Sequence, residues 1–205
     1  HPATFNGCPK ENSSWHGTFI AGQIAAATHN SLGVAGVSWG ARILPVRVSG
    51  KCGAFLSDIL DAMRWSAGLS VTGVPANANP ARIINLSFGG DAACSSTYQS
   101  VIDEVTAAGS LMVVAAGNDG GALRRPADCR NVLAVGAVRA DGLKTSYSNS
   151  GANVALMAPG GDGTLALTSL DNTGVFGPGL DTYGNKIGTS FSAPLASGVA
   201  ALMLS

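Results

Sequence analysis

The residues best suited to chemistry in this sequence are a serine and its neighbours in the run Gly188-Thr189-Ser190-Phe191-Ser192-Ala193-Pro194. The run predicts a loop that turns into a helix of small residues, with Ser190 at the helix N-terminus. Unpaired backbone N–H groups and the positive end of the helix dipole lie there, and both favour negative charge on a serine oxygen. Pro194 is expected in the first turn, where a missing N–H costs little. The alternative is that Thr189 or Ser190 merely caps the helix.

A histidine stands in a second run of the same kind, Trp15-His16-Gly17-Thr18-Phe19-Ile20-Ala21-Gly22, again where a helix is expected to begin. Together the two runs resemble the subtilisin-like serine proteases (subtilases, peptidase family S8), whose motifs are H-G-T-x-[VI]-A-G and G-T-S-x-[AS]-A-P. The resemblance continues through Asn85-Leu86-Ser87-Phe88-Gly89-Gly90 and Ala115-Ala116-Gly117-Asn118, so it covers essentially the whole chain. Among these relatives, the chain is most similar to secreted bacterial subtilases with extra disulfides.

The resemblance implies a serine endopeptidase that works through an acyl-enzyme. Ser190 corresponds to the nucleophile, and His16 corresponds to the general base that later protonates the leaving amine. The side-chain amide of Asn118 and the backbone N–H of Ser190 correspond to the oxyanion hole. Taken alone, an asparagine after a glycine is more typical of a turn.

The family binds its peptide substrates as an added β-strand between two flanking segments. The matching residues are Gly53, Ala54 and Phe55 on one side and Ser87, Phe88 and Gly89 on the other, with Ala115, Ala116 and Gly117 as the pocket floor. Small floor residues predict a pocket for bulky apolar or aromatic side chains. Phe55 and Phe88 can also be ordinary core residues.

The catalytic aspartate of the family has no counterpart in this sequence. The family places it in a D-[TS]-G motif on a first strand that precedes the histidine, but no aspartate occurs before His16. The aspartates from Asp58 to Asp181 lie in other contexts. We therefore expect residues 1–205 to be a single peptidase S8 catalytic domain that is incomplete at the N-terminus and the C-terminus, with the aspartate upstream. The resemblance also implies an N-terminal propeptide in the precursor.

Composition favours a compact enzyme and disfavours several other classes of protein. The 205 residues fit one domain, and 46% hydrophobic residues with 12% charged residues suit a close-packed α/β protein. Twelve Lys and Arg balance twelve Asp and Glu, so no basic field attracts nucleic acid or anionic lipid. No apolar run reaches the length of a membrane span. We expect a secreted monomer with protein or peptide substrates, without nucleic-acid or membrane partners. A peptide-binding relative without catalysis is the main alternative.

Strands and helices alternate in the predicted order of elements. Continuous apolar runs predict strands at 43–48, 82–87, 111–116, 132–138 and 154–158. Helical patterns occupy 57–67, with Ser57 as the N-cap, and 95–108, which ends at Gly109. Loops are predicted at 71–80 and 160–185. This order predicts the subtilisin-like three-layer α/β/α fold, with a mostly parallel sheet that lacks its first strand and a site at the carboxyl ends of the strands.

The sequence has four cysteines, Cys8, Cys52, Cys94 and Cys129, and none of them form a Cys-x-x-Cys pair. This spacing disfavours a zinc site and favours disulfides in an exported protein. Of the three possible pairings, we expect Cys8 with Cys52 and Cys94 with Cys129, because each would join loops on the active-site side. Free buried thiols are the alternative.

The predicted chemistry requires no cofactor or metal, although structural calcium is common in the family. The candidate oxygen ligands are Asp162, Asp171, Asp181 and Asn185. Their spacing matches no calcium-binding loop, so solvated loop residues are the alternative.

Overall fold

A parallel sheet forms the centre of the molecule. The computed structural model describes residues 12–50 and 52–205. Its sheet has the order β1-β2-β3-β4, with β1 (Ile83–Leu86), β2 (Leu111–Ala115), β3 (Val132–Val138) and β4 (Val154–Pro159) all parallel. All four strands lie where the sequence predicts them. The middle of the sheet is deeply buried, because β2 is buried at every residue after its first.

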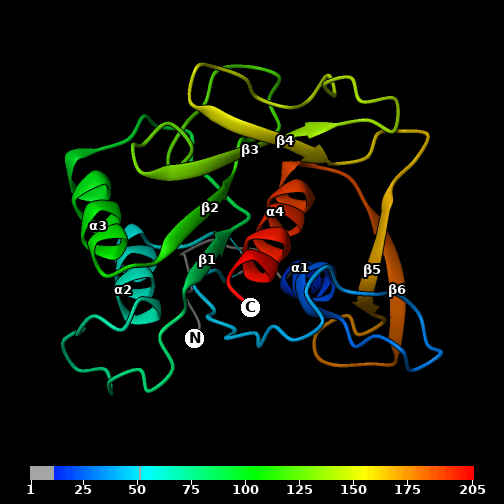
Figure 1. Ribbon diagram of the computed structural model, residues 1–205, viewed down its shortest axis with the longest axis horizontal. Helices are drawn as coiled ribbons and strands as arrows, with labels where there is room; N and C mark the ends of the chain where they lie inside the picture. Colours follow the sequence, from blue (N-terminus) through cyan, green and yellow to red (C-terminus); the bar gives the residue numbers. More distant parts are fainter. Residues whose placement is uncertain (1–11, 51) are drawn as a thin grey trace.

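Helices cover both faces of this sheet, as Figure 1 shows. On one face, α2 (Leu56–Ser66) and α3 (Ser96–Ala107) join a core that includes Met112 and Val114 of β2. On the other face, α4 (Thr189–Met203) packs on Val113 and Val135, with α1 (His16–Ala25) beside it. The predicted three-layer α/β/α fold with a mostly parallel sheet is thus confirmed. None of the helices in the described part of the chain has the length and apolar character needed to cross a bilayer.

The two predicted surface helices differ in how they begin. Helix α3 begins at Ser96, one residue after the predicted start, and the Ser95 hydroxyl caps it by accepting a hydrogen bond from the Tyr98 N–H at 3.2 Å. The prediction that Ser57 caps α2 is wrong. Helix α2 begins at Leu56 and has Phe55 at its N-cap, so Ser57 already lies inside the helix, where its hydroxyl contacts the Asp58 carboxylate.

Segment 43–48 is irregular, which contradicts the predicted strand. Ile43, Leu44 and Val46 are between 36% and 41% exposed. A strand exists only where a second strand supplies the ladder of backbone hydrogen bonds. Within residues 12–50 and 52–205, no strand pairs with this segment, so its apolar character alone does not make it a strand.

A hairpin lies where the sequence predicts only a loop at 160–185. The antiparallel strands β5 (Leu167–Asn172) and β6 (Asp181–Lys186) form a separate two-stranded sheet that lies against α1 (Figure 1). Polar cross-strand contacts support it, such as the hydrogen bond from the Thr168 hydroxyl to Asn185 Oδ1. Because these strands have little apolar alternation, the sequence pattern fails to reveal them.

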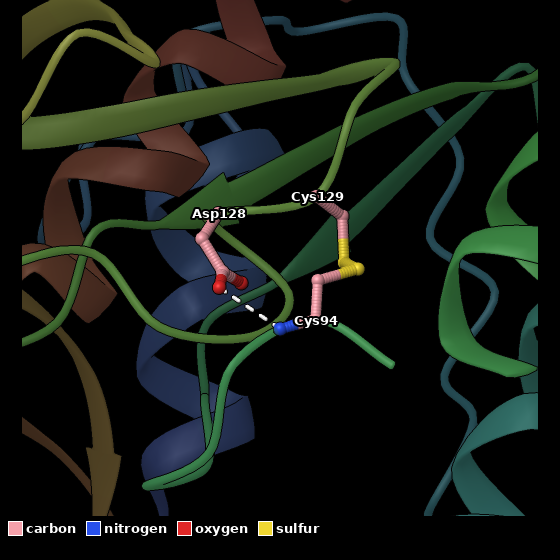
Figure 2. Close-up of side chains that lie close together, drawn as sticks. All are labelled: Cys94, Asp128 and Cys129. Atoms are coloured by element: carbon pink, nitrogen blue, oxygen red, sulfur yellow. Dashed lines mark hydrogen bonds between the residues drawn. A yellow bond between two sulfur atoms is a disulfide. The ribbon is translucent and has the colours of Figure 1, made fainter. Parts of the chain in front are cut away.

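A disulfide joins Cys94 and Cys129, as predicted, and links the segment before α3 to the segment before β3. The Asp128 carboxylate accepts a hydrogen bond from the Cys94 N–H at 2.9 Å, as Figure 2 shows. The other predicted disulfide, Cys8 with Cys52, includes Cys8, which lies outside the described residues.

Removing this disulfide should destabilise the protein by about 4 kcal/mol, because the bond closes a long loop in the unfolded chain. The two cysteines are 35 residues apart in the sequence. The measurement is the urea unfolding of the Cys94→Ser/Cys129→Ser variant. Ser100→Ala, a change on the exposed side of α3, is the control and should alter stability by less than about 0.5 kcal/mol. An unchanged unfolding midpoint in the double variant would show that the bond contributes nothing.

Candidate active site

Ser190 is the second residue of α4 and is half-buried. Helix α4 packs against β1. The Ser190 hydroxyl donates a hydrogen bond to the Ser87 carbonyl oxygen at 3.0 Å. In return, the Ser87 hydroxyl donates to the Ser190 carbonyl oxygen at 2.7 Å. Ser87 follows the last residue of β1, so these two bonds fix the start of α4 at the carboxyl end of that strand. This is the edge of the sheet where a site is expected.

Pro194 lies in the second turn of α4, so its predicted place in the first turn is wrong. A proline inside a helix leaves the carbonyl four residues earlier without its usual N–H donor. That carbonyl belongs to Ser190, and the Ser87 hydroxyl is its partner instead. The bond from Ser87 therefore explains how the helix tolerates the proline.

Asn118 is held directly beside the start of α4. It follows β2 and Gly117, whose φ of 104° is a conformation that favours glycine. Asn118 Oδ1 accepts hydrogen bonds from both the backbone N–H and the hydroxyl of Thr189, each at 2.9 Å. The Thr189 hydroxyl in turn accepts from the Gly117 N–H at 3.1 Å. Because these contacts occupy Oδ1, the side chain can offer its Nδ2 donors to a ligand.

A cavity of about 220 Å³ opens beside Ser190 and Asn118. The residues predicted from the family motifs that line it are Phe88, Gly89, Ala115, Ala116, Gly117, Asn118 and Ser190. Phe88 also packs against the core, so both interpretations of that residue hold. The predicted substrate-binding residues that do not line this cavity are Gly53, Ala54, Phe55 and Ser87. Gly53 instead bridges to Gly50, and Phe55 is the N-cap of α2.

His16 is the first residue of α1 and is half-buried near the start of α4. Its ring centre lies 5.3 Å from that of Phe191, the residue after Ser190. Burial lowers the pKa of His16, and the positive charge of Lys186 lowers it further. A lowered pKa keeps the imidazole neutral near pH 7, which is the form that can accept a proton.

Two contacts expected of a catalytic triad do not occur among the described residues. The Ser190 hydroxyl is bonded to Ser87 rather than to the His16 imidazole. In addition, no carboxylate in this part of the chain is hydrogen-bonded to the His16 ring, and Lys186 is the only charged group that shifts its pKa. The structure thus brings the serine, the asparagine and the cavity together, with the histidine adjacent.

Metal sites find little support in the described residues. The one group of side chains there with metal-like spacing is Cys94, Asp128 and Cys129, and its two sulfur atoms are already joined in the disulfide (Figure 2). The four candidate calcium ligands make separate contacts. Asp162 bonds Thr164, Asp171 pairs with Lys186, Asp181 accepts from Asn172, and Asn185 accepts from Thr168. They do not fit a calcium site.

The chain is similar in sequence to known proteases. Residues 2–205 match the family described as the Subtilase family. An extracellular basic protease from Dichelobacter nodosus is 50% identical over 198 residues, covering 96% of this chain and 32% of that protein. An extracellular protease from Xanthomonas campestris pv. campestris is 48% identical over 203 residues, covering 97% of this chain and 34% of that protein. The chain therefore spans about a third of the length of these two relatives.

Solved structures resemble the chain over nearly its full length. A protease from Pseudoalteromonas arctica PAMC 21717 superimposes with a TM-score of 0.92 and 45% identity, covering 98% of this chain and 62% of that chain. A cold-adapted subtilisin-like serine proteinase gives a TM-score of 0.72 and 27% identity, covering 92% of this chain and 60% of that chain.

Proposed function

This chain belongs to the subtilase family, and on that premise we propose that it carries the active site of a secreted serine endopeptidase. The observation that supports this most strongly is the shared location of the Ser190 hydroxyl, the Asn118 amide and a cavity at the start of α4. Two relatives named as extracellular proteases support secretion.

In the proposed reaction, Ser190 first exchanges its bond with the Ser87 carbonyl for one with the His16 imidazole. Ser190 Oγ then attacks the substrate carbonyl carbon while the imidazole takes the hydroxyl proton. The resulting oxyanion accepts hydrogen bonds from the Ser190 N–H and from Asn118 Nδ2. When the C–N bond breaks, the imidazolium gives its proton to the leaving amine. Water, deprotonated by the same imidazole, then attacks the acyl carbon. As the bond between that carbon and Ser190 Oγ breaks, the imidazolium returns the proton to Ser190 Oγ, so this chemistry uses no cofactor.

The residue that precedes the cleaved bond would place its side chain in the cavity. Ala115, Ala116 and Gly117 line that cavity. In the proposed site they form its floor, because their small side chains leave room for a substrate side chain. Peptides and proteins are therefore the proposed substrates. We place the carboxylate that orients the imidazole outside the described residues, and for this reason each activity experiment uses the full encoded protein.

Replacing Asn118 by alanine should reduce kcat by roughly 10²- to 10³-fold, because one donor to the oxyanion is lost. KM should change much less, because the ground-state carbonyl needs that donor less than the oxyanion does. The measurement is steady-state hydrolysis of a chromogenic peptide. Asn153→Ala serves as the control, because the Asn153 side chain is exposed and its amide donates a hydrogen bond to the Asp128 carbonyl, away from the cavity. An unchanged kcat in Asn118→Ala would remove Asn118 from the proposed mechanism.

The competing function, peptide binding without catalysis, predicts a different outcome for the same protein. New amino termini should appear when the endopeptidase is incubated with an unfolded protein. A non-catalytic relative would bind the unfolded protein without producing new amino termini.

A further inference from the structure

The backbone just before His16 is held by the β5–β6 hairpin. Trp15 has φ 51° and ψ 22°, a left-handed conformation that a bulky residue rarely adopts. The Trp15 indole N–H donates a hydrogen bond to the Gly174 carbonyl at 2.7 Å. The Ser13 N–H donates to the Val175 carbonyl at the same distance. Both acceptors lie in the connection between β5 and β6, so the hairpin stabilises an otherwise unfavourable conformation next to His16.

Lys186, the last residue of β6, adds a third connection to this segment. Its Nζ donates a hydrogen bond to the Ser14 carbonyl at 2.7 Å and lies 3.2 Å from Asp171 Oδ2 of β5. The same Nζ lies 5.3 Å from the centre of the Phe19 ring, one turn into α1. The side chains of Lys186 and Asp171 are only 22% and 17% exposed, so solvent screens this charge less than it would on an open surface.

We propose that Lys186 is a positioning residue for His16, which joins the β5–β6 hairpin to the segment before α1 and sets the charge that the imidazole faces. This inference rests on the proposed function, because it gives Lys186 a role in preparing the general base. The runs of this sequence that resemble the family motifs do not include Lys186, which follows directly after the predicted loop at 160–185.

The direction of the effect follows from the described charges around His16, since the carboxylate proposed to orient the imidazole is the same in every variant. The positive charge of Lys186 disfavours the imidazolium and so lowers the pKa of His16, after the larger effect of burial. Helices α1 and α4 carry no other charged side chain. In the described hairpin, Asp171 pairs with Lys186, whereas Asp181 is hydrogen-bonded to Asn172 at the opposite end of β6. Removing Lys186 should therefore raise the pKa of His16, and neutralising Asp171 should lower it.

The test compares the pH dependence of kcat/KM for the full encoded protein and three variants. In Lys186→Met, the acid limb should move to higher pH, because more of the histidine is protonated and inactive at a given pH. In Asp171→Asn, the acid limb should move to lower pH, because the lysine charge is no longer balanced. Lys186→Arg keeps the charge and should restore the wild-type profile. Loss of packing alone does not predict opposite shifts for the first two variants.

A second readout does not depend on turnover. Proton NMR titration of the His16 ring, assigned by the loss of its signal in His16→Gln, should give midpoints that shift in the same two directions. If wild-type protein hydrolyses no peptide, the proposed function fails, yet the titration still decides the role of Lys186. Identical midpoints and acid limbs in wild type, Lys186→Met and Asp171→Asn would overturn the inference.

Discussion

Replacing Ser190 by alanine should lower kcat for peptide hydrolysis by roughly 10⁶-fold, the scale observed when this type of enzyme loses its nucleophile. In the proposed reaction, the Ser190 hydroxyl oxygen forms the covalent bond to the substrate, and alanine provides no substitute. The cavity and the Asn118 amide should remain, because neither depends on the Ser190 side chain. Substrate binding should therefore persist in Ser190→Ala. The measurement is kcat for the full encoded protein with a chromogenic peptide, together with binding of the same peptide.

Ser192 offers a matched control for this change two residues further along α4. It is fully buried, and its hydroxyl has no hydrogen-bond partner among the described residues. Alanine at this position removes an unpaired buried hydroxyl, so Ser192→Ala should keep full activity and equal or greater stability. Full activity in Ser190→Ala would show that another group is the nucleophile.

Replacing His16 by glutamine should lower kcat by roughly the same 10⁶-fold, because the serine proton then has no acceptor. The stronger prediction concerns the double variant. Since a nucleophile without its base and a base without its nucleophile are equally ineffective, Ser190→Ala/His16→Gln should be no less active than either single variant. The measurement is kcat for all three variants under one set of conditions.

His29→Gln is the control for this second prediction, because His29 is exposed and contacts Trp39 rather than the site. It should retain wild-type kcat. If the effects of Ser190→Ala and His16→Gln multiply in the double variant, the two residues act independently and the proposed proton transfer between them is incorrect.

Local patterns in the sequence predict the central sheet well. The strands β1 to β4 are mostly apolar runs between turn residues. Strands β1 to β3 are largely buried, whereas the edge strand β4 is mostly exposed. Segment 43–48 is similarly apolar but irregular. An apolar run alone does not show whether a second strand is available to pair with it. The opposite error occurs at the β5–β6 hairpin, which the sequence predicts as a loop. Polar contacts between its strands support it, and these leave no apolar pattern in the sequence.

The motifs identify the candidate site residues that lie within them, but not the contacts between residues that are distant in the sequence. Ser190, His16 and Asn118 come from short runs with fixed residue types, and the structure places them close to the start of α4. The hydrogen bond from Ser87 to the Ser190 carbonyl is not predicted, because the sequence pattern places Pro194 in the first turn of the helix and the structure has it in the second. The contact of Lys186 with Ser14 joins residues that are 172 positions apart, and no local pattern records it.

The central claim is that Ser190 is a nucleophile activated by His16, and covalent labelling with a fluorophosphonate tests it most directly. The Ser190 oxygen should displace fluoride and bond to phosphorus, so digestion and mass spectrometry of the full encoded protein should find one adduct, on the peptide that contains Ser190. Labelling should be absent in Ser190→Ala and strongly slowed in His16→Gln. A folded wild-type protein that is not labelled, or that is labelled on a different residue, would contradict the account.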